Sequence, residues 1–154
     1  NWKPAGRSVV KPNMWTSYTL NDYRFKDYQQ GTDDFSGNPV TGVPKQIWVG
    51  GVDLQWRRGY AQATFTLNDE LPLNDAATEY AEAYSLVSLK VGWRQPFGKG
   101  LVIDAFVGGD NLLNEKYSLG NDLNAFGGRY YNAAAPRNGY AGVRLDLGMK
   151  KSNR

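Results

Sequence analysis

The chain has 154 residues, a formal net charge of +3, and neither cysteine nor histidine. This length corresponds to about one domain, and the missing cysteines exclude disulfides and thiolate metal sites. Without histidine there is no Ser–His or Cys–His nucleophile pair and no usual zinc ligand set. The weak and scattered charge gives no reason to expect nucleic-acid binding.

The sequence also lacks the patterns that mark several other classes of protein. No run of 18 apolar residues exists, which excludes a transmembrane helix of the usual length. No phosphate loop or dinucleotide fingerprint occurs. The opening residues, Asn1 to Pro4, lack the basic start and apolar stretch of a signal peptide, so an exported protein would be present here in mature or truncated form.

Alternation of apolar and polar residues with period two dominates the first half, which predicts strands. Met14 to Tyr28 is rich in Trp, Tyr and Thr and is expected to be a long strand with a change of phase. The clearest strand runs from Gln46 to Trp56. A tight connection at Arg57–Gly59 leads to a strand over Ala61–Leu67, so the pair predicts a hairpin.

The second half repeats this pattern. Residues Asp75–Ala83 carry the chain's main helical spacing and could form one turn of helix. A strand is then expected from Ala83 to Trp93, a turn at Gln95–Gly100 and a strand from Leu101 to Gly108. The closing strand runs over Tyr140–Leu147. The sequence therefore predicts an all-β fold, an antiparallel meander of about six strands.

Short and long connections alternate along this meander. The long ones cover Gln29–Lys45, Asn68–Glu82 and Tyr117–Asn138. Short turns on one side and long polar loops on the other are typical of outer-membrane barrels. The polar strand face carries charges such as Lys90 and Asp104. The apolar face could pack on another sheet in water or could contact lipid, and the alternation alone leaves both readings open.

Tryptophans near strand ends favour the membrane reading. Trp48, Trp56 and Trp93 stand on the apolar face near the ends of their strands. Trp and Tyr are enriched at membrane–water interfaces, where they form aromatic belts. An aromatic-rich soluble sandwich or barrel remains the alternative.

Four segments, in chain order, resemble one family, the TonB-dependent outer-membrane receptors. They are the turn Gly37–Lys45, the strand Tyr84–Trp93, the element Asp110–Tyr117 and the closing segment Pro136–Leu147. The residues that carry the resemblance most directly are Gly37, Asn38, Gly42, Val43, Pro44, Asn111, Leu112, Tyr117, Arg137 and Gly142. Members of the family usually end on an aromatic residue, whereas Leu147 stands at that position here.

The resemblance implies the C-terminal part of a transmembrane β-barrel in the Gram-negative outer membrane, acting in uptake of an iron–siderophore complex or a similar nutrient. It divides the chain into a lead-in (residues 1–13), a barrel segment (14–147) and a polar tail (148–154). The implied partners are outer-membrane lipid and lipopolysaccharide, the other strands and plug of the receptor, and TonB through that plug. Neither a cofactor nor a metal is implied, and no enzymatic activity.

Ligand contacts are expected in the last long loop. Phe126, Arg129, Tyr130 and Tyr131 combine aromatic rings with a cation and could grip an anionic, catecholate-like chelate. The plainer reading is that the two tyrosines pack within the loop or belong to an aromatic girdle.

For the polar residues at the two ends of this loop we expect mainly structural roles. Asn111 and Asn114 bracket a strand end, where Asn caps turns and tolerates left-handed backbone. Arg137 could pair with a carboxylate or with lipopolysaccharide phosphate, or could be a solvated residue at a strand end.

Six strands are too few for a conventional membrane barrel, which starts at eight, and lipid does not tolerate unpaired strand edges. We therefore expect a part of a longer protein, although pairing of copies or a compact soluble fold stay open. A self-contained small barrel that binds a hydrophobic ligand is one alternative function. An enzyme is another, using acids of one loop for acid–base work or Ca²⁺ binding, namely Asp69, Glu70, Asp75, Glu79 and Glu82.

Overall fold

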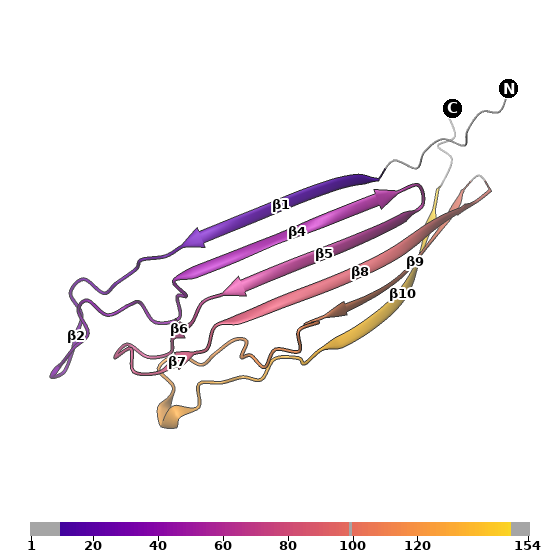
Figure 1. Cartoon of the computed structure of the whole chain (residues 1–154). Coiled ribbons are helices and arrows are strands. Elements are labelled where there is room, and N and C mark those ends of the chain that lie inside the picture. Colours follow the sequence, from indigo (N-terminus) through magenta and orange to yellow (C-terminus); the bar gives the residue numbers. More distant parts are fainter. Residues whose placement is uncertain (1–9, 99, 149–154) are drawn as a thin grey trace, which may run out of the picture.

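Six long strands form one antiparallel sheet in the order β1-β4-β5-β8-β9-β10 (Figure 1). The structure is a computed structural model that describes residues 10–98 and 100–148. The strands are β1 (Lys11–Leu20), β4 (Gln46–Trp56), β5 (Gly59–Asn68), β8 (Tyr84–Phe97), β9 (Leu101–Asp110) and β10 (Asn138–Leu147). Neighbours in the sheet are also neighbours along the chain, which confirms the predicted meander.

The connections alternate between the two ends of the sheet. The short connections from β4 to β5 and from β8 to β9 lie at one end, and loops of residues 21–45, 69–83 and 111–137 lie at the other (Figure 1). The loops hold small elements of their own: the hairpin of β2 (Gln29–Gln30) and β3 (Asp33–Asp34), the hairpin of β6 (Leu71–Pro72) and β7 (Tyr80–Ala81), and the 3₁₀ turn η1 (Phe126–Gly128). In the described ranges no helix is long and apolar enough to cross a membrane.

The register keeps all charged residues of the six-stranded sheet on one face. Because side chains alternate along a strand, residues paired across strands share a face. One row across the sheet reads Met14, Val52, Ala63, Leu89, Gly109 and Gly139. The next row, on the opposite face, reads Asn13, Asp53, Gln62, Lys90, Gly108 and Tyr140.

We call the face of Met14 the outer face and that of Asn13 the inner face. Followed through all six strands, the outer face contains no Asp, Glu, Lys or Arg. The inner face carries Lys11, Asp53, Lys90, Arg94, Asp104, Asp110, Arg144 and Asp146.

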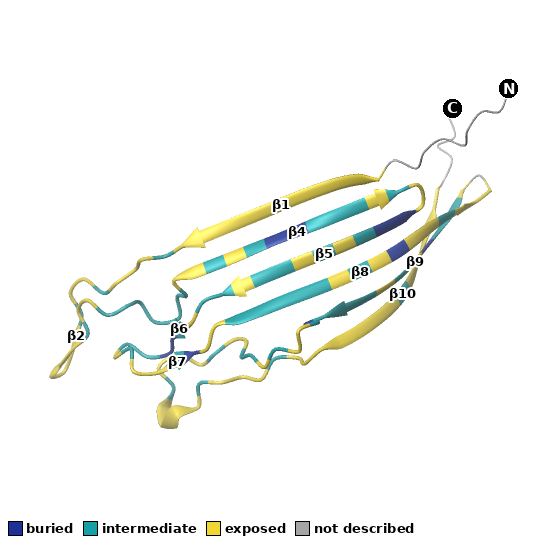
Figure 2. Ribbon diagram, in the orientation of Figure 1, coloured by how far each residue is buried: buried dark blue, intermediate teal, exposed yellow. Residues whose placement is uncertain are grey.

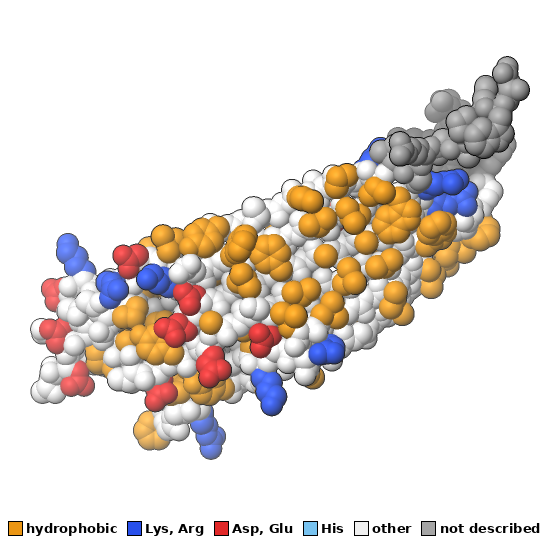
Figure 3. Space-filling model, in the orientation of Figure 1, with side chains coloured by type: hydrophobic (Ala, Val, Ile, Leu, Met, Phe, Trp, Pro, Cys, Tyr) orange, Lys and Arg blue, Asp and Glu red, His pale blue; other side chains and the backbone are white. Residues whose placement is uncertain are grey.

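Burial runs opposite to the usual pattern of a water-soluble sheet. Outer-face side chains such as Val107 (59%) and Leu147 (76%) are exposed, while Asp104 (3%) and Tyr60 (6%) on the inner face are buried. Figure 1 shows the sheet curling away behind β8, and Figure 3 shows hydrophobic side chains spread over the strands on the side in view. Most buried strand positions in Figure 2 lie on β4, β5 and β8. The sheet is therefore curled with its apolar face convex and its polar face concave.

Aromatic rings laid over glycines help to set this curl. A Cβ at Gly92 would lie 2.2 Å from Cζ of Tyr60, so the Tyr60 ring crosses β8 at a position where only glycine leaves room. The Phe106 ring stands in the same relation to Gly142, across β9 and β10. Rings over strand glycines cover exposed backbone and pin the register.

Three sequence expectations are corrected. The first strand spans Lys11–Leu20 rather than Met14–Tyr28, because pairing with β4 continues back to Lys11. After Leu20 the aromatic residues pack on one another inside the loop, with the rings of Phe25 and Tyr28 4.8 Å apart. Of the expected lead-in and tail, residues 1–9 and 149–154 lie outside the described residues.

The other two corrections concern connections. β8 runs on to Phe97, where it pairs with Leu101, so residues 95–97 belong to the strand and not to the turn expected at Gln95–Gly100. Asp75–Ala83 is not helical but includes the returning strand of the β6–β7 hairpin. Its turn is fixed by the side chain of Asn74, which binds Thr78, and by Ala77 in the left-handed region at φ 51°.

We predict that Gly92→Ala destabilises the sheet, because the added methyl group displaces the Tyr60 ring. Overpacking of this kind costs about 1–3 kcal/mol. The measurement is the urea dependence of unfolding. Gly139→Ala is the matched control, since a Cβ there meets no atom closer than 3.6 Å. Equal stability of the two variants would contradict this account of Gly92.

Candidate functional site

A hollow of about 410 Å³ lies on the inner face and is lined from all six strands of the sheet. Its lining residues are Trp15, Asp53, Gln62, Thr64, Ser88, Leu89, Lys90, Asp110 and Tyr140. Trp15 is on β1 and Tyr140 on β10, the two edge strands. Residues from opposite edges can line one hollow only because the sheet is curled, so the fold itself builds this site.

Two aromatic rings at the hollow lie flat on the backbone. A Cβ at Gly51 would come within 2.8 Å of the Trp15 indole, and one at Gly108 within 2.5 Å of Cζ of Tyr140. Trp15 remains 46% exposed and Tyr140 39% exposed. Each ring therefore has one face against a glycine and keeps accessible surface beside the hollow.

The polar groups between the rings include both donors and acceptors. Gln62 Nε2 donates to Asp53 Oδ1 at 2.9 Å, and Asn13 Nδ2 approaches Asp53 Oδ2 at 3.4 Å. Lys90 Nζ lies 4.2 Å from the centre of the Phe106 ring, a cation–π contact. The hollow can thus offer hydrogen bonds of both kinds, and its acids outnumber its single lysine.

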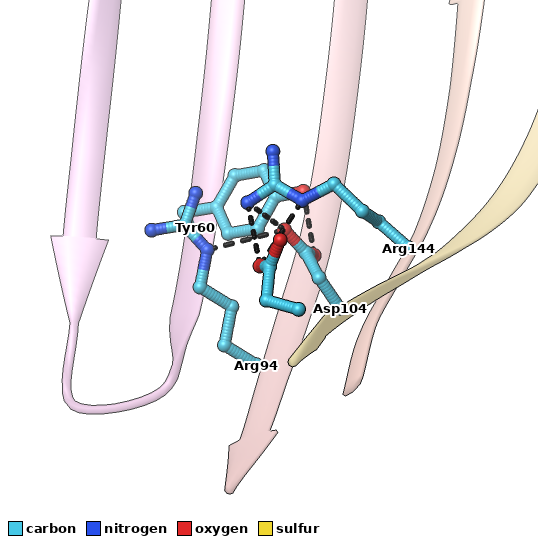
Figure 4. A network of polar contacts seen from close by, with 5 residues as sticks. Tyr60, Arg94, Asp104 and Arg144 are labelled. Carbon is cyan, nitrogen blue, oxygen red and sulfur yellow. Dashed lines mark hydrogen bonds and ion pairs between the residues drawn. The ribbon is translucent and has the colours of Figure 1, made fainter. Parts of the chain in front are cut away.

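A buried carboxylate, Asp104, ties four strands together on the turn side of the hollow (Figure 4). Tyr60 Oη donates to its Oδ1 at 2.9 Å and Arg94 Nε to its Oδ2 at 3.2 Å. An Arg144 guanidinium nitrogen lies 3.7 Å from Oδ2 and also pairs with Asp146 at 3.1 Å. A buried charge is tolerated when it is paired and hydrogen-bonded. Asp104 therefore acts as a structural tie across β5, β8, β9 and β10.

A second carboxylate, Asp75, holds the three long loops together. Its side chain accepts hydrogen bonds from Tyr28 at 3.2 Å, from Thr41, and from Asn124 Nδ2 at 3.0 Å. Asn38 Nδ2 donates to its backbone carbonyl at 2.9 Å. Burial alone would raise the pKa of Asp75, but the hydrogen bonds from Thr41, Asn124 and Tyr28 outweigh it and lower the pKa below its ordinary value. We call this arrangement the loop cap.

Asn111 and Asn114 close the base of the last loop as the sequence predicts. Both adopt positive φ, 50° and 58°. The buried Asn111 side chain donates to the carbonyls of Glu115 at 2.9 Å and Ala135 at 3.2 Å, and its own oxygen accepts from the Glu115 amide. Asn114 accepts from the backbone amide of Arg137 at 3.2 Å.

The predicted ligand residues are only partly brought together. Phe126 is fully exposed in η1 and Arg129 is exposed beside it. The rings of Tyr130 and Tyr131 meet edge to face at 6.4 Å, and Tyr131 Oη donates to the Tyr80 carbonyl. Tyr131 lines a groove of about 550 Å³ between loops 69–83 and 111–137, but the other three residues do not. The tyrosine pair therefore packs within the loops, as the plainer reading expects.

The residues that carry the family resemblance mainly hold loops and strands in place. Gly37 and Gly42 have φ of 85° and 78°, and the Gly42 amide donates to the Pro72 carbonyl at 2.8 Å. The Pro44 carbonyl accepts from Asn21 at 2.9 Å. The backbone amides of Val43 and Leu112 donate to the carbonyls of Val40 and Val87, respectively. The Tyr117 ring packs on that of Tyr84, and Gly142 lies under the Phe106 ring.

The acids of loop 69–83 do not assemble into an ion site. Within the described residues, no group of three acidic side chains is placed to hold a metal ion. Asp75 is occupied by neutral hydrogen-bond donors, and Glu79 is exposed. Among the described residues, this loop therefore holds no calcium cage.

The inner-face hollow was not identified from the sequence. Part of its signal was present, because Asp53, Gln62 and Lys90 are polar residues that each stand between two apolar neighbours on their strands. The missing information was the curl that brings β1 and β10 to one hollow. No protein-family model and no curated protein matches this chain.

We predict that acid loosens the loop cap. A carboxylate with a lowered pKa in the folded state adds stability above its unfolded pKa, near 3.8, and this stability is lost as the pH falls through the lower folded value. Asp75→Ala should remove the same stabilisation at neutral pH, and faster amide hydrogen exchange in all three long loops is the readout. Glu79→Ala, in the same loop but exposed, is the control; unchanged exchange in Asp75→Ala would refute the assignment.

Proposed function

We propose that this chain is a wall segment of a larger outer-membrane β-barrel, a TonB-dependent receptor that imports an iron–siderophore complex or a similar nutrient. The observation that carries the barrel proposal is the outer face, which is convex, exposed and free of charged side chains across six strands. Water disfavours so large a contiguous apolar surface. Lipid solvates it, while the charges of the inner face remain in an aqueous lumen.

The dimensions of the outer face support the same proposal. The strands are 10–14 residues long, enough for tilted membrane-spanning strands of about 9–11 residues. Trp48 and Trp56 stand near the two ends of β4. Eight residue steps at about 3.3 Å, tilted by about 40°, separate them by roughly 20 Å along the membrane normal. This is close to the apolar band of about 25 Å that aromatic girdles flank.

The two free edges support a larger protein. β1 and β10 each have one neighbour in the sheet, so each presents a row of backbone groups without a strand partner among the described residues. Such groups are not tolerated in the hydrocarbon core of a bilayer. We therefore assign their partners to further strands of the same barrel, in contact with outer-membrane lipid and lipopolysaccharide outside.

The family assignment rests on the four sequence segments and on where the fold puts them. Gly37–Lys45 and Asp110–Tyr117 lie at the long-loop end, and Pro136–Leu147 contains β10, the last strand of the described residues. Nutrient capture would fall to the long loops and the lumen-facing wall, and energy would come from TonB acting on a plug outside this chain. A small barrel with a hydrophobic interior fits less well, because the concave face is the polar one.

Fractionation of the native cell tests the proposal. We expect an antibody against this chain to detect, in the outer membrane, a band several times larger than 17.2 kDa. The protein should migrate differently on gels before and after boiling, as folded barrels do. A soluble band near 17.2 kDa would overturn the proposal.

A second prediction concerns single charges. Val107→Arg places a cation in the middle of the outer face and should cost about 2–4 kcal/mol, which reduces the folded fraction in the outer membrane. Gln62→Arg is the control, because it places the same cation on the inner face beside Asp53. In a soluble protein the Val107 change would be harmless or would improve solubility, so that result would count against a lipid-facing surface.

A further inference from the structure

We infer that a basic pocket at the turn end of the sheet, where the short connections lie, binds a phosphate group. The pocket has a volume of about 250 Å³, and its lining includes Arg57, Arg58, Arg94, Gln55, Tyr60 and Pro96. We call it the rim pocket. The inference goes beyond the proposed function and does not rest on it, because strands of the sheet itself form the pocket.

The rim pocket lies at a step where β8 extends past the hairpin of β4 and β5. The last pair between β5 and β8 joins Gly59 to Trp93, whereas β8 continues to Phe97 beside β9. The Arg94 amide donates to the Arg58 carbonyl at 2.8 Å, and Pro96, two residues later, has no N–H to donate. The pocket is therefore at the rim of the sheet, and it requires no open space along the wall.

Arg94 presents to this pocket a guanidinium group whose position is already fixed. Its Nε donates to Asp104 Oδ2 at 3.2 Å, and its guanidinium carbon lies 4.6 Å from the centre of the Tyr60 ring. In Figure 4 its two terminal nitrogens point away from Asp104 and contact none of the residues drawn. The planar fork of Arg matches the oxygens of a phosphate group. Because the side chain is ordered in advance, binding costs less conformational entropy.

The second arginine, Arg57, stands where the backbone favours a different residue. Its φ of 46° lies in the left-handed region, which glycine adopts without a steric penalty. Backbone strain of this kind persists where the surrounding structure enforces it, and it clusters at functional sites. Glycine would give the turn less strain but no charge. We therefore attribute the arginine to ligand binding.

The charge of the rim pocket selects an anion with more than one negative charge. Among the described residues that line it, none is acidic. Asp104 compensates Arg94, but the ion pairs of the described residues do not include Arg57 or Arg58. Arg58 Nη1 donates instead to the neutral Gln95 Oε1 at 2.7 Å. Two positive charges thus remain, which match the charge of about −1.5 to −2 on a phosphate monoester at pH 7.

The wider distribution of charge agrees with this selection. In the described part of the face shown in Figure 3, Lys and Arg side chains are visible at the turn end and no acidic side chain is. The acidic side chains of that view gather over the long loops. An anion is therefore attracted to the turn end and repelled from the acids of the long loops.

Titration of the purified native protein with glycerol 3-phosphate tests the inference. We expect calorimetry to give a saturable isotherm with a dissociation constant of about 1 mM or tighter. The affinity should rise between about pH 5 and about pH 8, because the ester loses its second proton near pH 6 while the arginines stay charged. The absence of saturable binding, or an affinity that does not rise with pH, would overturn the inference.

Variants locate the binding. Arg57→Gly and Arg58→Gln should each weaken it about tenfold or more, as loss of a charge-assisted hydrogen bond does. Arg57→Gly should leave the protein at least as stable to urea, because glycine relieves the strain at this φ, so its weaker binding would not reflect unfolding. Lys26→Gln is the matched control: it removes one positive charge from an exposed residue of loop 21–45 and should bind like the wild type.

Two outcomes with these variants would refute the site. Equal weakening in all three would mean attraction by net charge alone. Wild-type affinity in Arg57→Gly and Arg58→Gln would place the phosphate elsewhere. Arg94 is unsuitable for this test, because its loss would deprive the buried Asp104 of a partner.

A short-chain lipid distinguishes the two sources of such a phosphate group. Displacement of glycerol 3-phosphate by dihexanoyl phosphatidylglycerol would support the rim pocket as a site for a lipid headgroup. Retention of glycerol 3-phosphate would support it as a site for a soluble phosphate ester.

Failure of this inference is distinguishable from failure of the proposed function. An outer-membrane protein that does not bind glycerol 3-phosphate would leave the barrel proposal standing and remove the phosphate site. A soluble protein near 17.2 kDa that binds it through Arg57 would remove the barrel proposal and keep the site.

Discussion

One constraint governs the molecule: a single side-chain register must hold across all six strands. Because side chains alternate with period two, a slip of one residue in any strand would exchange the side chains of its outer and inner faces. The Asp104 tie joins four strands, and the rings over Gly51, Gly92 and Gly108 mark single positions where a bulkier residue does not fit. The inner-face hollow exists because this register and the accompanying curl are kept from β1 to β10.

Much of the sheet could be predicted because its signal is local. Gln46–Trp56 carries one continuous apolar face, with Trp48, Val52 and Trp56, and was predicted with the correct ends. The left-handed conformations of Asn111 and Asn114 also follow from residue type. The tie between Tyr60 and Asp104 could not be predicted, since it joins residues 44 positions apart across an intervening strand. The same holds for the hollow, whose two aromatic rings come from opposite edges of the sheet.

The loops were the least predictable part, for a related reason. Asp75 lies in a segment with helical spacing, yet its conformation is set by Tyr28, Thr41 and Asn124 in two other loops. The fully buried Leu73 lies beside it, and its carbonyl accepts from the amide of Asn124. Tertiary contacts of this kind override local propensity. They also separate the loop region into a packed cap and an exposed tip around Phe126.

That separation bears on how such a protein could change its specificity. A substitution or insertion in the cap must preserve contacts that three loops make with one carboxylate, so the loops cannot diverge independently there. Residues 126–129 at the tip make none of these contacts with Asp75, and Phe126 is fully exposed. Substitutions and insertions should therefore destabilise the fold least at the tip. The tip could acquire new ligand contacts while the loop cap and the sheet below it keep their geometry.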